Sequence, residues 1–151
     1  MHRFRIIALL LTVTATACDR NPYDPTQQPR VTVTTTSSPV LISWQPGGAQ
    51  LVRVYRGATA GDGYTTALVW SLAASSKNSL SSGVAYGTAA PAGGATDVPA
   101  KPLVAGDSYT VQVTRQDPKG TGDGFTNNSN RYVGTRTFTA GDVAAFAAAS
   151  R

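Results

Sequence analysis

From residue 31 onward, the chain consists of short runs in which apolar and polar residues alternate, separated by clusters of Gly, Pro, Ser and Asn. A period of two places apolar side chains on one face of a β-strand, whereas a helix needs a period near 3.6. The alternating runs predict about seven short strands in residues 31–139, which is typical of a single antiparallel β-sandwich. We therefore expect an all-β fold, with strands near residues 31–36, 40–45, 50–56, 67–72, 82–86, 108–115 and 131–139.

The alternation also predicts which side chains face the core. In the second predicted strand, Val40, Ile42 and Trp44 share one face, and in the sixth, Tyr109 and Val111 do so. β-Branched and aromatic residues pack well on a pleated surface. We expect these faces to point inward.

Three motifs resemble parts of a fibronectin type III domain. Residues 40–46, Val-Leu-Ile-Ser-Trp-Gln-Pro, resemble that family's second strand, and residues 51–56, Leu-Val-Arg-Val-Tyr-Arg, resemble the strand that follows. Residues 103–113, Leu-Val-Ala-Gly-Asp-Ser-Tyr-Thr-Val-Gln-Val, resemble its tyrosine corner. The resemblance covers both ends of residues 31–139.

This resemblance implies roles for four residues. Trp44 lies in the core before a proline-containing turn, and Tyr109 is the corner residue, whose hydroxyl binds upstream backbone. Leu103 is its apolar companion, and Gly106 is the turn residue. We therefore expect Trp44, Leu103 and Tyr109 to be structural.

The middle of the chain departs from the family pattern. Between Arg56 and Leu103 lie 46 residues, more than a simple type III domain usually places there, and residues 88–102 are rich in Ala, Gly and Pro. A long hairpin followed by a structured loop would account for the excess. The strand assignment in residues 57–102 stays open.

Residues 1–17 have the parts of a secretory signal peptide: basic residues, an apolar run and a stretch of small residues. The apolar run is shorter than the roughly 20 residues that span a membrane. Residues 15–18, Ala-Thr-Ala-Cys, resemble a lipobox, in which a signal peptidase cuts before a lipid-modified cysteine. The resemblance implies that Cys18, the only cysteine, anchors the chain to a membrane. The alternative is an ordinary signal peptide cut near Ala17.

Residues 18–30 contain three prolines and no apolar periodicity, so we expect a flexible tether that follows the lipidated Cys18. Tyr23 within it is interpreted as incidental. Asp19 resembles the signal that retains some lipoproteins in the inner membrane, and a periplasmic or a surface-facing position both stay open. Residues 140–151 form a short Ala-rich tail, in which a helix would be marginal alone.

The composition of the mature chain excludes several function classes. Without residues 1–17, the chain has 11 basic and 8 acidic residues, no His and no Glu. The basic residues are scattered singly, which argues against a nucleic-acid partner. The lack of His and of a free thiol removes Ser-His-Asp and Cys-His machinery and most zinc sites. Most Asp residues adjoin Gly or Pro, as in turns. We expect no enzyme activity, metal or cofactor.

Residues 117–130 carry one further alternative, a calcium loop. This segment has oxygen ligands and glycines but lacks the regular acids and closing Glu of an EF-hand. A flexible connection between the last two strands explains it with fewer assumptions.

Three aromatic residues, Tyr64, Trp70 and Phe125, are candidates for a binding surface, because they lie in turns or on strand faces that could point outward. Exposed aromatic side chains often mark recognition surfaces. The competing interpretation places them in the sandwich core.

The sequence as a whole favours a non-catalytic interaction module that is exported and anchored to the membrane of a bacterial cell envelope. Its partner would be an envelope protein or a polysaccharide. The alternatives are an envelope enzyme that uses Asp residues on glycans, and a carbohydrate-binding accessory domain.

Overall fold

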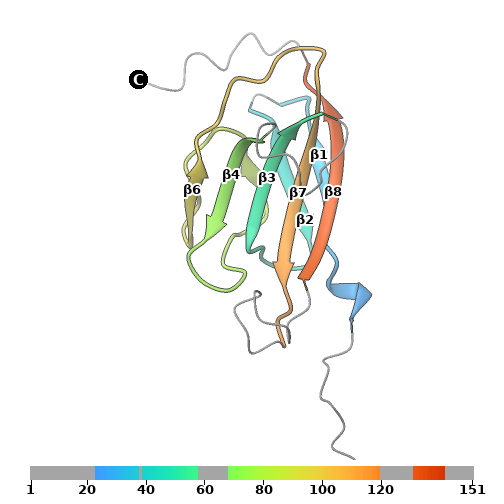
Figure 1. The fold of residues 1–151 in the computed structure, drawn as a ribbon, viewed down its shortest axis with the longest axis vertical. Helices are drawn as coiled ribbons and strands as arrows, with labels where there is room; N and C mark the ends of the chain where they lie inside the picture. Colours follow the sequence, from blue (N-terminus) through green and yellow to red (C-terminus); the bar gives the residue numbers. More distant parts are fainter. Residues whose placement is uncertain (1–22, 38, 58–67, 120–130, 142–151) are drawn as a thin grey trace, which may run out of the picture.

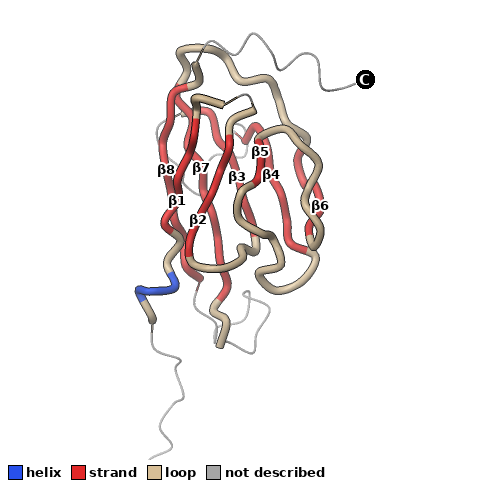
Figure 2. Tube along the Cα trace, turned by 180° about the vertical axis from the view of Figure 1, so that it is seen from behind, coloured by secondary structure: helices blue, strands red, loops and turns tan. Residues whose placement is uncertain are grey.

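The computed structural model describes residues 23–37, 39–57, 68–119 and 131–141. In these ranges the chain forms two antiparallel β-sheets that pack face to face (Figures 1 and 2), which confirms the expected all-β sandwich. The strands are β1 (Arg30–Thr34), β2 (Leu41–Gln45), β3 (Leu51–Arg56), β4 (Leu68–Ala74), β5 (Val84–Ala85), β6 (Gly94–Val98), β7 (Ser108–Gln116) and β8 (Arg131–Thr139).

The smaller sheet has the strand order β1-β2-β5. Val31 lies opposite Trp44 and Val33 opposite Ile42, because β1 and β2 run antiparallel. Ile42 and Trp44 are buried, whereas Leu41, which alternates with them along β2, is exposed. The alternation predicted for this strand therefore gives the inner face of the smaller sheet.

The larger sheet has the order β6-β4-β3-β7-β8. In its centre, Val52 lies opposite Val113 and Val54 opposite Val111. All four side chains are fully buried. Valine fits a pleated, buried surface well, so these pairs form the middle of the core.

The middle of the chain differs from the prediction. The strand expected at residues 82–86 is reduced to the two residues of β5, and β6 lies in the Ala-, Gly- and Pro-rich region. β6 pairs with β4 at the sheet edge. A Cβ on Gly94 would lie 2.3 Å from Cδ2 of Leu80. The glycine that weakens the strand signal therefore lets β6 lie close to the buried Leu80 side chain.

The core also contains two aromatic pairs. The ring centroids of Trp70 and Tyr86 lie 5.1 Å apart, and those of Tyr109 and Phe138 lie 5.7 Å apart. The first pair joins β4 of the larger sheet to the residue that follows β5 of the smaller sheet, and the second joins the neighbouring strands β7 and β8. Aromatic pairs at this spacing stabilise a core beyond the area that they bury.

The strand directions define two ends of the sandwich. At the basal end, β1 and β8 begin and β7 ends; at the distal end, β7 begins and β8 ends. The 3-10 helix η1 (Pro25–Gln27) precedes β1 at the basal end (Figure 1). Ala140 continues the chain at the distal end, where its backbone bonds with Asp107. The two ends of the described chain therefore lie at opposite ends of the sandwich.

Within the described ranges, no helix is long and apolar enough to cross a membrane. The predicted leader, the lipidation residue Cys18 and residues 142–151 of the tail lie outside those ranges.

Candidate functional site

Residues 23–29 pack across the basal end of β7 and β8, and we call them the basal plug. The sequence interpretation assigned residues 18–30 to a flexible tether, whereas the structure shows residues 23–29 in contact with the sandwich. Pro29 is buried, and a Cβ on Gly134 of β8 would lie only 2.0 Å from its carbonyl oxygen. The chain therefore lies directly on the backbone of β8.

Tyr132 is the main contact of the basal plug. Its hydroxyl oxygen accepts a hydrogen bond of 3.1 Å from the backbone N–H of Asp24. The ring of Tyr23 lies over that of Tyr132, with a centroid distance of 5.1 Å. Tyr132 is 1% exposed, whereas Tyr23 is 55% exposed. The exposed ring of Tyr23 thus packs on the outer side of the buried Tyr132 ring.

Arg115 provides a second connection. Its Nη1 donates a hydrogen bond of 2.8 Å to Oε1 of Gln27, 88 residues away. The same guanidinium lies beside Gly47 in the turn between β2 and β3, where a Cβ would come within 3.0 Å of Nη2. Gln28 adds a bond of 3.2 Å from Nε2 to the carbonyl oxygen of Val133. The plug is therefore held by side chains from both of the last two strands.

Asp24 caps η1. Its Oδ1 accepts hydrogen bonds from the hydroxyl and the backbone N–H of Thr26, at 2.7 and 3.0 Å. These bonds, the hydroxyl first, lower the pKa of Asp24 below its ordinary value. The Asp-Pro-Thr sequence is a helix-start signal that was available in the sequence, with Asp as N-cap and Pro at the first helical position.

A pocket of about 260 Å³ lies between the basal plug and the end of β7. The pocket contains two carboxylates, those of Asp24 and Asp117. Asp117 is 2% exposed, and its Oδ1 accepts a hydrogen bond of 2.8 Å from the backbone N–H of Lys119. Both carboxylates of the pocket are thus bonded in turns. The pocket is lined by Tyr23, Asp24, Pro25, Gln27, Asp117, Pro118, Lys119 and Tyr132.

Only residues 117–119 of the segment considered as a calcium loop are described. Among the described residues, no three His, Cys, Asp or Glu side chains come together as a metal-binding group. The rest of that segment lies outside the described residues.

The three aromatic binding candidates are not brought together. Trp70 is fully buried and packs against Tyr86 in the core, so of the two interpretations given for it the structure agrees with the core and not with an outward-facing surface. Trp70 lies opposite the buried Val54 and shares its face of β4 with the buried Leu72. Tyr64 and Phe125 lie outside the described residues.

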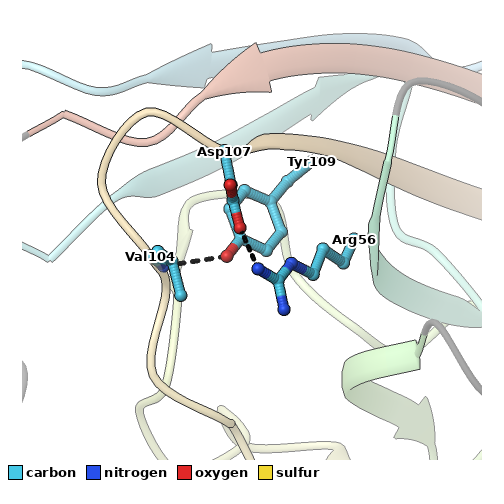
Figure 3. Close-up of polar contacts among 4 residues, drawn as sticks. All are labelled: Arg56, Val104, Asp107 and Tyr109. Atoms are coloured by element: carbon cyan, nitrogen blue, oxygen red, sulfur yellow. Dashed lines mark hydrogen bonds and ion pairs between the residues drawn. The ribbon is translucent and has the colours of Figure 1, made fainter.

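The three residues expected in the core are buried there: Trp44 is 2%, Leu103 7% and Tyr109 1% exposed. The hydroxyl of Tyr109 accepts a hydrogen bond of 2.8 Å from the backbone N–H of Val104 (Figure 3). Gly106, the expected turn residue, has φ +81°. The loop before β7 is therefore closed by the bond that the tyrosine-corner motif implies.

An ion pair lies beside this corner. Arg56 at the end of β3 pairs through Nη2 with Oδ2 of Asp107, in the turn that precedes β7 (Figure 3). The Arg56 side chain is more than half exposed, so the pair contributes little to stability. The pair does neutralise the charges of Arg56 and Asp107 at the distal end.

Comparison with protein-family models, with curated proteins and with solved structures gave no match. The site is therefore interpreted from its own chemistry. At the basal end, tyrosines, an arginine and amide side chains join the N-terminal segment to the sandwich. This arrangement fixes the direction in which the chain enters the domain.

Proposed function

We propose that this chain is a lipid-anchored, non-catalytic interaction module of the bacterial cell envelope. Export and anchoring are supported by the leader-like residues 1–17, the lipobox-like sequence before Cys18 and the lack of any other cysteine. Lipidation would remove the hazard of an unpaired thiol in an oxidising compartment. Cys18 is then the residue that defines where the sandwich acts.

The observation that carries the proposal is the docking of the basal plug. Tyr23 is held to Tyr132 at the basal end, and only five residue steps separate it from Cys18. Five steps reach at most about 18 Å. An anchor at Cys18 would keep the basal end near the bilayer and direct the distal end away from it.

The distal end is then the surface for an envelope protein or polysaccharide. It contains the loop before β7, in which the Val104 side chain is 47% exposed. The bond between Tyr109 and the backbone of Val104 ties this loop to the first residues of β7. A preorganised loop loses less conformational entropy on binding. The same bond supports the assignment of the domain as fibronectin type III-like.

Anchoring is tested by replacement of Cys18. Radiolabelled palmitate should enter the wild-type chain, and the Cys18→Ser chain should remain unlabelled and either uncleaved or released from the membrane. A control chain that carries Cys18→Ser together with Ser37→Cys keeps one thiol but places it outside the lipobox-like residues. This chain should also remain unlabelled. Normal processing and membrane retention of Cys18→Ser would contradict the proposal.

The distal surface is tested with two exposed valines. Val104 lies at the distal end, whereas Val133 lies near the start of β8 and is 37% exposed. We expect Val104→Asp to weaken capture of the envelope partner by the mature domain about tenfold, with Val133→Asp unchanged, since burying an unpaired carboxylate in an interface is costly. Equal effects of the two substitutions would remove the argument for the distal end.

One observation favours a second candidate, a carbohydrate-binding accessory domain. A groove of about 520 Å³ lies between the β2–β3 turn and the β4–β5 loop. Nε1 of Trp44, one of its lining residues, is buried and has no hydrogen-bond partner among the described residues. The lining carries hydroxyl, amide and backbone groups but no charged side chain: Trp44, Gln45, Gly47, Gly48, Asn78, Ser79, Leu80, Ser81 and Ser82.

Neutral hydrogen-bonding groups of this kind suit the hydroxyls of an uncharged sugar. The test is calorimetric titration of the mature domain with neutral and acidic polysaccharides. Binding of a neutral glycan that Trp44→Phe weakens and Trp70→Phe leaves unchanged would favour this candidate. Wild-type protein that binds no neutral glycan would exclude it.

A further inference from the structure

Basic residues gather at the basal end. Four of them are exposed and come from four separate parts of the chain: the start of β1, the β4–β5 loop, the turn after β7 and the start of β8. Lys77 and Lys119 lie close together, because Nζ of Lys77 donates a bond of 3.4 Å to the carbonyl oxygen of Pro118. We call this set the basal basic rim: Arg30, Lys77, Lys119 and Arg131.

The acids of the same end only partly offset the rim. The described basal residues contain two acids, Asp24 and Asp117, and Asp117 is buried in its turn. Half-buried Arg115, bonded to Gln27, adds a fifth positive charge. The sequence supplies one more acid, Asp123, between β7 and β8. The basal end therefore keeps a net positive charge.

The distal end has a different balance. Arg56 and Asp107 form an ion pair there, and Lys101 is the remaining charged residue of the described distal loops. The positive charge of the described domain is thus concentrated at the basal end, which is the end nearest in sequence to residue 18.

We propose that the basal basic rim lies against the anionic headgroups of the membrane that holds the anchor. This inference rests on the proposed lipid anchor at Cys18, which keeps Tyr23 within about 18 Å of the bilayer surface. Tyr23 lines the same basal pocket as Lys119 of the rim. Basic residues within about one Debye length of an anionic leaflet are attracted to it, each by about a fivefold increase in binding. The rim adds an electrostatic membrane contact to the lipid anchor and orients the distal end outward.

The test uses the soluble mature chain that carries Cys18→Ser, so that membrane binding does not depend on lipidation. The chain is floated with vesicles of phosphatidylcholine alone or of phosphatidylcholine with phosphatidylglycerol, at low and at high salt. We expect binding to the anionic vesicles at low salt, its loss at high salt, and none to the neutral vesicles.

Two double variants with the same change in net charge locate the surface. Lys77→Glu with Lys119→Glu alters the rim, whereas Lys101→Glu with Arg136→Glu alters exposed residues outside it. We expect the rim variant to lose at least about tenfold in binding to anionic vesicles and the control variant to lose about twofold or less.

Absence of binding to anionic vesicles, or equal losses in the two variants, would overturn the inference. Either result would leave the lipid anchor untouched, because palmitate labelling at Cys18 tests that separately. Failure of labelling with intact vesicle binding would instead refute the anchor and leave a basal surface that binds anionic lipid by charge alone.

Discussion

The backbone N–H of Asp24 donates a hydrogen bond to the hydroxyl of Tyr132, 108 residues further along the chain. This bond joins the segment that enters the domain to the strand that completes it. Because Tyr132 is buried and Asp24 belongs to the basal plug, the contact makes the stability of the sandwich depend on residues that precede its first strand.

Removal of the Tyr132 hydroxyl tests this dependence. Tyr132→Phe should lower the free energy of unfolding by about 1 kcal/mol, because it leaves a part-buried N–H without its acceptor. Urea denaturation provides the measurement, and hydrogen exchange at Asp24 should accelerate. The matched control is Tyr55→Phe, whose hydroxyl makes a longer bond of 3.3 Å to Gln112. An unchanged exchange rate at Asp24 in Tyr132→Phe would show that the plug is held by other contacts.

A glycine substitution should displace the basal plug more strongly. The Cβ of Gly134→Ala would lie 2.0 Å from the carbonyl oxygen of Pro29, a backbone atom that cannot rotate away. We expect a loss of about 1–3 kcal/mol, as for other overpacked sites, and faster tryptic cleavage after Arg30. Gly141→Ala is the control, since nothing lies within 4 Å of its added Cβ. Similar stabilities for the two variants would contradict the close approach of the plug to β8.

The alternation of apolar residues was enough to predict most of the sandwich. Strands β1, β2, β3, β7 and β8 lie within a residue or two of their expected positions, because apolar and polar residues alternate along each of them. The pattern failed at β6, whose Gly94 and Ala95 carry no strand signal. Pairing with β4, a tertiary contact, is what makes this segment a strand.

The candidate site was less predictable than the fold. The tyrosine corner depends on residues within one short motif, so it can be predicted from the sequence. The basal plug depends instead on pairs such as Gln27 and Arg115, which are 88 residues apart. Three prolines in residues 18–30 favoured a tether. Residues 23–29 of that segment belong to the domain because they contact Tyr132 and Gly134 of β8. Periodicity of a single chain contains no signal for such a contact.

The corner itself makes a stability prediction. Tyr109→Phe removes the acceptor of the Val104 N–H, and we expect a loss of about 1–2 kcal/mol in the free energy of unfolding. Tyr23→Phe should cost less than about 0.5 kcal/mol, because its hydroxyl bond to Gln28 is exposed to water. Thermal denaturation of both variants checks the difference. Two equal losses would mean that the Tyr109 hydroxyl bond makes no special contribution.

Stability at high pH should depend on Tyr86. Burial raises the pKa of its hydroxyl above the ordinary tyrosine value of 10.0, and the nearby Tyr109 raises it further. Below pH 10 the hydroxyl is protonated in both the folded and the unfolded chain, so its contribution is fully present. Above that pH the unfolded chain loses the proton while the folded chain keeps it, and stability falls by up to about 1.4 kcal/mol per pH unit.

Tyr86→Phe provides the comparison for this pH dependence. The variant loses the hydrogen bond of 2.6 Å from the hydroxyl to the carbonyl oxygen of Lys101, so it should be less stable than wild type at neutral pH by about 1 kcal/mol. Its free energy of unfolding should nevertheless fall less steeply than that of wild type above pH 10, because the ionisable group is gone. The slopes of the two urea-derived curves, and not their absolute values, are therefore the measurement. Parallel slopes would show that Tyr86 ionises with an ordinary pKa and that its side chain is reached by water in the folded domain.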